Sequence, residues 1–322
     1  MMRSLLGMTL ALFGLALAAP TALHAQGFPT KPIRFLVPFA PGGGADASGR
    51  LAAKLLATRM NHSVIVENRP GANGAIGIDA VAKSAPDGHT LIVVSNGFTI
   101  SAATEKGLPF DPKKDLVPLL IFGEQALVLV VNPSVPATNA QELAQLARGK
   151  PGALTFATSD PATSLATDMF RKGIKADIVS VPYKGAGQGL VDVLGGQITG
   201  VITSFSTVLS QMKAGKVRGI AVTTTSRSNM APELPTLTES IAPGYEFASW
   251  FGLFAPSATP REILLKLNGD LAAALQAQDG RDQFLALGLT TLPESLERVN
   301  ERVTREFIKW EAVAKAAGMA VQ

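Results

Sequence analysis

Residues 38–46 read P-F-A-P-G-G-G-A-D, a glycine turn bracketed by prolines that joins two segments of different character. The apolar run before it, Ile33–Val37, is typical of a buried strand. The alanine-rich segment after it, Ala45–Met60, favours a helix. The turn therefore predicts a strand-to-helix connection of an α/β protein, with free backbone N–H groups where the helix begins.

The glycines allow three interpretations. Gly42, Gly44 and Ala47 match the dinucleotide-binding fingerprint, but Pro41 stands at the mouth of the turn and Asp46 would lie beside the pyrophosphate. The glycines can also serve only to permit a tight turn. In the third interpretation, which we favour, main-chain N–H groups at the turn and the helix dipole bind a carboxylate, with no arginine in the site.

The first 25 residues have the pattern of a cleavable secretory signal. Arg3 is their only charge, an apolar stretch follows from Leu5 to Ala19, and cleavage is expected near Ala25 and Gln26. An uncleaved anchor is the alternative, but this stretch is shorter than the about 20 residues that a transmembrane helix needs. An exported protein meets little nicotinamide cofactor. The chain has no cysteine, so neither a disulfide nor a lipid attachment is expected.

The charged residues exclude some function classes. Arg3 is lost with the signal, so the net charge falls from +4 to +3, and the basic residues are scattered rather than clustered. A nucleic-acid surface needs a basic patch, and we therefore expect no nucleic-acid partner. After cleavage only His62 and His89 remain, far apart in sequence, so no metal site is expected. The sequence also lacks a Gly-x-Ser-x-Gly elbow, so we expect no enzyme and no cofactor.

Short β-branched runs alternate with amphipathic segments along the rest of the chain. Among them we expect separate strands at 117–121 and 127–131 and a helix at 186–194. This alternation predicts parallel sheets with helical crossovers, an α/β architecture. Two places look like domain crossings: Gly123–Gln125, where one apolar run ends and another begins, and the polar stretch Thr223–Pro235. We expect a discontinuous first lobe, residues 26–124 and 228–322, and an inserted second lobe, residues 125–227. Two such lobes form a ligand clamp that closes by hinge motion.

Several longer motifs occur in order along the chain. They include K-P-I-R-F-L-V-P-F-A-P-G-G-G-A-D (31–46), V-E-N-R-P-G-A-N-G (66–74), A-K-S-A-P-D-G-H-T-L (82–91), V-P-Y-K-G (181–185), L-G-G-Q (194–197), K-A-G-K-V-R (213–218) and S-W-F-G-L-F-A-P (249–256). With these motifs the chain resembles the substrate-binding receptors of tripartite tricarboxylate transporters, the Bug family.

The resemblance implies a two-lobed, periplasmic binding protein-like fold of type II. Each lobe is expected to be a mostly parallel sheet flanked by helices, with the ligand cleft between the lobes. The implied function is that of a monomeric periplasmic protein that captures a small organic carboxylate by lobe closure and delivers it to membrane transporter subunits. Two alternatives remain open: a ligand-sensing partner of a membrane signalling receptor, and an exported hydrolase.

The resemblance also implies the ligand-binding positions, which fall where predicted strands meet the following turns, as open α/β sheets place their ligands. In the first lobe they are Phe39, Ala40, Pro41, Gly42, Gly43, Gly44, Asn73, Gly74, Ala75, Ser95 and Asn96. In the second lobe they are Thr158, Ser159, Thr163, Ser164, Tyr183, Gly185, Thr203 and Ser204.

Three departures from the family pattern bear on the ligand. Residues 158–166 lack the glycines and the histidine of many relatives, and Asp160 there either brings a negative charge to the site or caps a helix that begins at Pro161. Ile202-Thr203 replaces a Phe-Asp pair whose aspartate can partner an ammonium, so we expect an aliphatic or aromatic mono- or dicarboxylate without an amino group. Gly97-Phe98-Thr99-Ile100 stands where many relatives have Gly-Thr followed by Asn-Pro, and Phe98 is expected either to wall the pocket or to lie in the core.

Overall fold

The computed structural model describes residues 27–316, of which residues 31–316 belong to one compact unit. The predicted signal peptide lies outside the described residues. Among the helices that are described, none has the length and apolarity required to cross a membrane.

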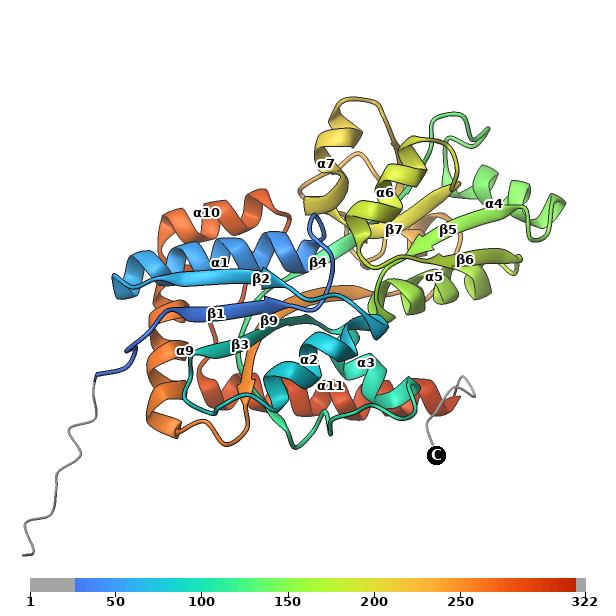
Figure 1. Ribbon diagram of the computed structural model, residues 1–322. Helices are drawn as coiled ribbons and strands as arrows, with labels where there is room; N and C mark the ends of the chain where they lie inside the picture. Colours follow the sequence, from blue (N-terminus) through green and yellow to red (C-terminus); the bar gives the residue numbers. More distant parts are fainter. Residues whose placement is uncertain (1–26, 317–322) are drawn as a thin grey trace, which may run out of the picture. The chain divides into compact units, whose positions relative to one another are not determined.

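Strands and helices alternate along this unit (Figure 1). The strands are β1 (Ile33–Val37), β2 (Val64–Asn68), β3 (Thr90–Ser95), β4 (Leu116–Val131), β5 (Leu154–Thr158), β6 (Ile178–Pro182), β7 (Gly200–Ser204), β8 (Arg218–Val222), β9 (Ala248–Pro256) and β10 (Thr290–Thr291). The helices are α1 (Gly44–Met60), η1 (Ala72–Gly74, a 3₁₀ turn), α2 (Ala75–Ala82), α3 (Gly97–Thr104), α4 (Ala140–Gly149), α5 (Pro161–Gly173), α6 (Ala186–Leu194), α7 (Phe205–Lys213), α8 (Leu237–Ser240), α9 (Arg261–Gln276), α10 (Gln278–Ala286) and α11 (Leu296–Ala316).

Two groups of strands meet along β4. The strand order is β2-β1-β3-β9-β4-β7-β5-β6, and β8 and β10 also pair with β4. Strands β1, β2, β3, β9 and β10 form the first group, and β5, β6, β7 and β8 form the second. Strands β2 and β3 both pair with β1 in the parallel direction, and strands β6 and β7 both pair with β5 in the parallel direction. Figure 1 shows α1 and α2 on opposite faces of the first group, and α5 and α6 on opposite faces of the second.

The sheet is mixed rather than mostly parallel. Every antiparallel ladder involves β4 or β9, the long strands that carry the chain between the two groups. The sequence predicts two strands, at 117–121 and 127–131, where the structure has the single strand β4. Shifts of register next to β9, one of them between Ile121 and Gly123, let this strand continue past the predicted crossing.

Hydrophobic packing connects the two groups of strands. One buried cluster contains Ile100 of α3 and Trp310 of α11 together with Phe156 and Phe170 from β5 and α5. Leu237 and Phe247, which follow the second predicted crossing, lie in the same cluster. The division into lobes at residues 124 and 227 stays a prediction.

Phe98 lies in the core. It is 3 % exposed, and its ring lies 5.2 Å from that of Phe254 and 5.9 Å from that of Phe307. The interpretation of Phe98 as a pocket wall is therefore wrong, because the helix α3 turns this ring toward α11.

Strand ends and helix beginnings meet at one region of the fold. The turn after β1 leads into α1, and the turns after β5 and β6 lead into α5 and α6. Strand β7 leads into α7 without an intervening residue. The carboxyl ends of parallel strands are where α/β sheets place their ligands, so this topology gathers four helix N-termini at a candidate site.

Candidate functional site

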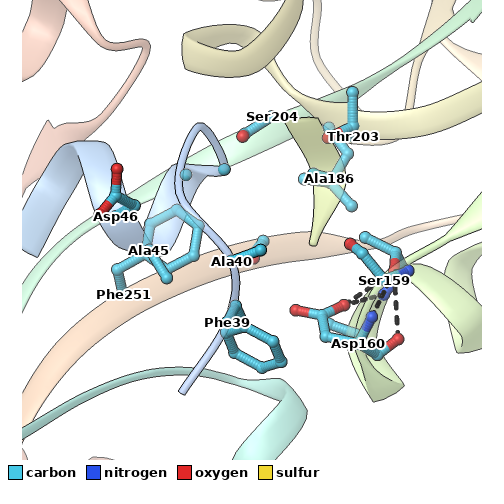
Figure 2. Close-up of a pocket in the computed structure, with 16 residues that line it drawn as sticks. Phe39, Ala40, Ala45, Asp46, Ser159, Asp160, Ala186, Thr203, Ser204 and Phe251 are labelled. Atoms are coloured by element: carbon cyan, nitrogen blue, oxygen red, sulfur yellow. Dashed lines mark hydrogen bonds between the residues drawn. The ribbon is translucent and has the colours of Figure 1, made fainter. Parts of the chain in front are cut away.

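A cavity of about 40 Å³ lies where these helix N-termini meet (Figure 2). This volume exceeds the about 10–15 Å³ that one water molecule requires. The cavity is lined by Phe39, Ala40, Gly43, Gly44, Ala45, Asp46, Leu127, Ser159, Asp160, Ala162, Thr163, Ala186, Thr203, Ser204, Ser249 and Phe251.

Helix α1 presents an uncapped N-terminus to the cavity. Its N-cap residue is Gly43, whose lack of a side chain leaves the first turn without a side-chain acceptor. The first helical hydrogen bond runs from the Ala47 N–H to the Gly43 carbonyl, at 3.0 Å. The N–H groups of Gly44 and Ala45 precede it and have no acceptor within the helix, so they are available to an anion.

Gly44 also permits close packing at the cavity wall. A Cβ on this residue would lie 2.5 Å from the ring of Phe251 and 2.6 Å from the Ser204 hydroxyl. Those distances are too short for real atoms, so only glycine lets α1 approach β9 and the start of α7. The first turn of α1 is thereby held against residues from both strand groups.

Helices α6 and α7 begin in the same manner. The N-cap residues are Gly185 and Ser204, and neither caps its helix with a side chain. The Ser204 hydroxyl instead interacts with that of Thr207, at 3.0 Å. Three helices therefore direct the partial positive charge of uncapped N-termini toward one cavity.

Helix α5 differs, because Asp160 caps it. The Asp160 Oδ1 accepts hydrogen bonds from the Thr163 N–H at 2.7 Å and from the Thr163 hydroxyl at 2.8 Å, while its Oδ2 accepts one from the Ser95 hydroxyl at 3.1 Å. The Thr163 hydroxyl is also placed to accept the Asp160 N–H, which completes a capping box. The interpretation of Asp160 as an N-cap is confirmed, and its carboxylate also lines the cavity.

Two carboxylates line the cavity, and their surroundings differ. Burial would raise the pKa of Asp46, but hydrogen bonds from Arg50, Asn68 and the Gly42 N–H, together with the Arg50 charge, hold that pKa below its ordinary value of 3.8. An ion pair of 2.9 Å to Arg50 balances its charge. Asp160 has no ion pair with any described residue, and no lysine or arginine is among the described residues that line the cavity.

Turns from the two strand groups touch beside the cavity. The Ala40 N–H donates to the Lys184 carbonyl at 3.0 Å. A Cβ on Gly185 would lie 2.8 Å from the Ala40 Cβ, and one on Gly187 would lie 3.0 Å from the Pro41 carbonyl oxygen. Glycines at the start of α6 therefore allow the turn before α1 to come this close.

The structure brings eight of the nineteen predicted ligand-binding residues to the cavity wall. They are Phe39, Ala40, Gly43, Gly44, Ser159, Thr163, Thr203 and Ser204. Asn73, Gly74 and Tyr183 line a neighbouring cavity of about 230 Å³, which Phe39 and Ser159 also line.

The other predicted residues lie around these cavities rather than in their walls. Ser95 and Asn96 are 2 % and 1 % exposed, and their side chains bond Asp160 and the Ala248 carbonyl. Pro41, Gly42 and Gly185 belong to the touching turns, Ala75 begins α2, and Thr158 and Ser164 flank the α5 cap.

The prediction omitted eight lining residues: Ala45, Asp46, Leu127, Asp160, Ala162, Ala186, Ser249 and Phe251. Ala45 and Ala186 follow directly from the uncapped helix starts. Leu127, Ser249 and Phe251 come from β4 and β9. Ser249 and Phe251 belong to the motif at 249–256, but nothing in the local sequence indicates that they reach the cavity. Trp250, which the sequence places beside Phe251, is 3 % exposed and stacks on Phe254.

A metal centre has no support in the described part of the chain. No group of three or more His, Asp or Glu side chains is placed there to hold an ion. His62 is half-buried, with its Nε2 3.0 Å from the Lys31 carbonyl oxygen, and His89 is buried; neither lines the cavity.

A cavity where uncapped helix N-termini meet between two strand groups can bind a small anion. A family model for the tripartite tricarboxylate transporter family receptor matches residues 49–319. The chain belongs to this receptor family. The resemblance drawn from the sequence is thereby confirmed.

Individual members of the receptor family are similar over almost the whole chain. The chain is 33 % identical to the protein BugT of Bordetella pertussis, over 94 % of this chain and 93 % of BugT. Among solved structures, that of Rpa4515 of R. palustris with adipate has a TM-score of 0.87 and 33 % identity, and covers 91 % of this chain and 99 % of its own. The structure of MatC of Rhodopseudomonas palustris with bound malate has a TM-score of 0.84 and 30 % identity, and it covers 89 % of this chain and 99 % of its own. The periplasmic binding protein-like fold is confirmed.

Proposed function

We propose that this receptor-family chain is a solute-binding protein that captures a small organic carboxylate in the cavity and delivers it to a membrane transporter of the tripartite tricarboxylate type. One observation carries the proposal: the uncapped N-termini of α1, α6 and α7 meet at a cavity. Their N–H groups and dipoles stabilise an anion without a basic side chain. The adipate and malate bound to two similar proteins support a carboxylate as that anion.

The proposal includes where the protein works and how it moves. The secretory pattern of residues 1–25 supports export to the periplasm, with cleavage near Ala25 and Gln26. The contact of Ala40 with Lys184 supports capture by closure, with residues 26–124 and 228–322 as one lobe and 125–227 as the other. The protein acts as a monomer, its partners are the ligand and the transporter subunits, and it catalyses no reaction.

The ligand lacks an amino group. Ile202 and Thr203 follow the Gly-Gly-Gln motif, after which the family pattern often has Phe-Asp, so the aspartate that would hold an ammonium is absent from this place. Thr203 lines the cavity with a neutral hydroxyl. Calorimetry in which aspartate or glutamate binds tightly, while acids without an amino group do not, would contradict this part of the proposal.

The function is tested with the chain that begins at Gln26. A panel of small carboxylates is screened by thermal unfolding, because a ligand at ~100 times its dissociation constant stabilises the native state by about 2.7 kcal/mol. We expect at least one carboxylate to raise the midpoint, with its dissociation constant then measured by calorimetry. A panel that leaves the midpoint unchanged would refute the proposal.

Ala186→Pro then tests the role of the amides. Ala186 is the first residue of α6, where proline fits because Gly185 is extended (φ −177°, ψ 153°) and the N–H is not needed by the helix. Losing one charge-assisted hydrogen bond weakens binding by about 10-fold or more. Gln278→Pro is the matched control, at the first residue of α10 and outside the cavity wall, and should leave binding unchanged.

A further inference from the structure

Asp160 sets a limit on the ligand that the proposed carboxylate site accepts. Its carboxylate lies in the cavity wall, and Figure 2 shows it pointing toward the turn that carries Phe39 and Ala40. Asp46, the other acid of the wall, lies on the far side of the cavity in the same view and is paired with Arg50. Asp160 is the wall carboxylate whose charge no described cation balances.

The N-terminus of α5 is thus already occupied by an anion of the chain itself. Asp160 accepts the Thr163 N–H at 2.7 Å, which is the kind of bond that α1, α6 and α7 leave open for a ligand. Of the four helix N-termini around the cavity, three have no side-chain cap and can bind a ligand carboxylate, and the fourth, that of α5, is capped by the carboxylate of Asp160.

The remaining hydrogen-bonding capacity of Asp160 is small. An ionised carboxylate offers about four acceptor positions. Three of them are used, two by the N–H and hydroxyl of Thr163 and one by the hydroxyl of Ser95. One position is left, which suits a single hydroxyl hydrogen and is poorly suited to an ammonium with three.

We propose that the Asp160 carboxylate makes this receptor selective for monocarboxylates whose other end is neutral. The inference rests on the proposed function: the ligand carboxylate binds at α1, α6 and α7, and its other end faces Asp160. A second carboxylate there would meet a like charge, which costs affinity. Apolar side chains of the wall, including Phe39, Leu127 and Phe251, suit the neutral end.

Asp160→Asn isolates the charge. Asparagine caps helices as well as aspartate does, so its Oδ1 can still accept the Thr163 N–H, and the Ser95 hydroxyl can accept from its amide. Asp160→Ser, a second neutral cap, guards against an effect peculiar to asparagine. Asp168→Asn is the matched control: it makes the same charge change on α5, outside the cavity wall, where Asp168 pairs with Arg171 at 3.2 Å.

The probes are two pairs, each a monocarboxylate and the dicarboxylate with the same number of carbons: butyrate with succinate, and hexanoate with adipate. A fifth probe, 4-aminobutyrate, carries an ammonium at its other end. Dissociation constants are measured by calorimetry on the full mature chain. For the wild type and Asp168→Asn we expect the monocarboxylate of a pair to bind at least about 10-fold more tightly than its dicarboxylate. In Asp160→Asn and Asp160→Ser the affinity for the dicarboxylate should rise at least about 10-fold, and the affinity for the monocarboxylate should change little.

Four outcomes would overturn the inference. If wild type binds a dicarboxylate as tightly as its partner monocarboxylate, the proposed selectivity does not exist; if the Asp160 variants gain no affinity for dicarboxylates, the selectivity does not come from Asp160. In both cases the proposed function stands. If wild type binds 4-aminobutyrate best and Asp160→Asn loses it, Asp160 serves an ammonium instead. If no probe binds wild type or any variant, both the inference and the proposed carboxylate site fail.

Discussion

The backbone of Ala40 is hydrogen-bonded to that of Lys184, with 3.0 Å between the N–H nitrogen and the carbonyl oxygen. This bond joins the turn before α1 to the turn before α6. Gly185, the next residue, approaches Ala40 so closely that a Cβ would lie 2.8 Å from the Ala40 Cβ and 3.0 Å from its carbonyl oxygen. Closing the cavity therefore depends on a missing side chain.

Gly185→Ala should weaken ligand binding. The extended backbone of Gly185 accepts alanine, so the added methyl acts through its side-chain contacts, of which the three shortest are to Ala40. Overpacking of this kind costs about 1–3 kcal/mol, which corresponds to roughly 5- to 150-fold in affinity. Calorimetry with the carboxylate that stabilises wild type most measures the change. Gly269→Ala is the control, because a Cβ on Gly269 meets no atom within 4 Å, and this variant should bind as wild type does. Equal affinity in the two variants would contradict the role given to the contact between residue 185 and Ala40.

Stability in acid should depend on Asp46. The folded pKa of this group lies below its ordinary value of 3.8: burial would raise it, and the bonds from Arg50, Asn68 and Gly42 more than offset that effect. Its contribution is therefore complete well above 3.8 and is lost as the pH falls through the lower folded pKa. Asp46→Asn should cost about 1–3 kcal/mol of unfolding free energy near neutral pH.

Denaturant unfolding of wild type and Asp46→Asn over a pH series measures this. The difference between the two should shrink toward acid, because protonation removes from wild type what the substitution removes at every pH. A difference that stays constant down to the acid limit would show that the Asp46 charge contributes nothing.

Both tyrosines of the chain should resist ionisation. The hydrogen bond from the Tyr183 hydroxyl to the Asp192 carboxylate, 2.5 Å long, together with burial and the Asp192 charge, raises the pKa of Tyr183 to about 12. Burial raises the pKa of Tyr245 as well. In each case the folded pKa exceeds the unfolded one, so the stabilisation is complete below about 10 and is lost as the pH rises through the folded pKa.

Ultraviolet titration of tyrosinate should therefore show no ionisation near the ordinary value of 10.0 while the protein is folded. Asp192→Asn should bring the signal of one tyrosine to lower pH, because it removes the Asp192 charge and leaves only a neutral amide oxygen to accept the Tyr183 hydroxyl. Circular dichroism at each pH is the check that the fold persists. Two tyrosines ionising near 10 in the folded wild type would disprove both assignments.

Ligand binding should not need histidine. His62 and His89 lie outside the cavity wall, so the double variant His62→Gln, His89→Gln should keep the affinity of the wild type. Thermal unfolding is recorded alongside, since His89 is 5 % exposed and its loss can lower stability without touching the site. Abolished binding in a folded double variant would favour the alternative of a hydrolase.

The sequence predicted the elements whose own residues mark them, through an apolar period or a capping glycine. α6 was expected over 186–194 and lies there, because its apolar period and the glycine before it agree. Helix α3 was missed, because its residues carry no helical period and the packing of Phe98 on Phe254 and Phe307 favours the helix. The break expected at Gly123 is absent, because β10 pairs there: a Cβ on Gly123 would lie 2.4 Å from the Thr290 carbonyl oxygen.

The candidate site shows the same division. Its helix-start residues, such as Gly43 and Ser204, follow from the rule that ligands bind at the carboxyl ends of strands. Phe251 and Leu127 reach the wall from the middle of strands whose pairing joins residues far apart in sequence. No local pattern records that pairing.

Strand β4 runs unbroken from Leu116 to Val131; its residues 116–126 pair with one group of strands and its residues 127–131 pair with the other. If either group unfolds, β4 loses hydrogen bonds, and the other group also pairs with β4. Heat should therefore denature the protein in a single cooperative transition, and a protease should find no independently folded fragment to release.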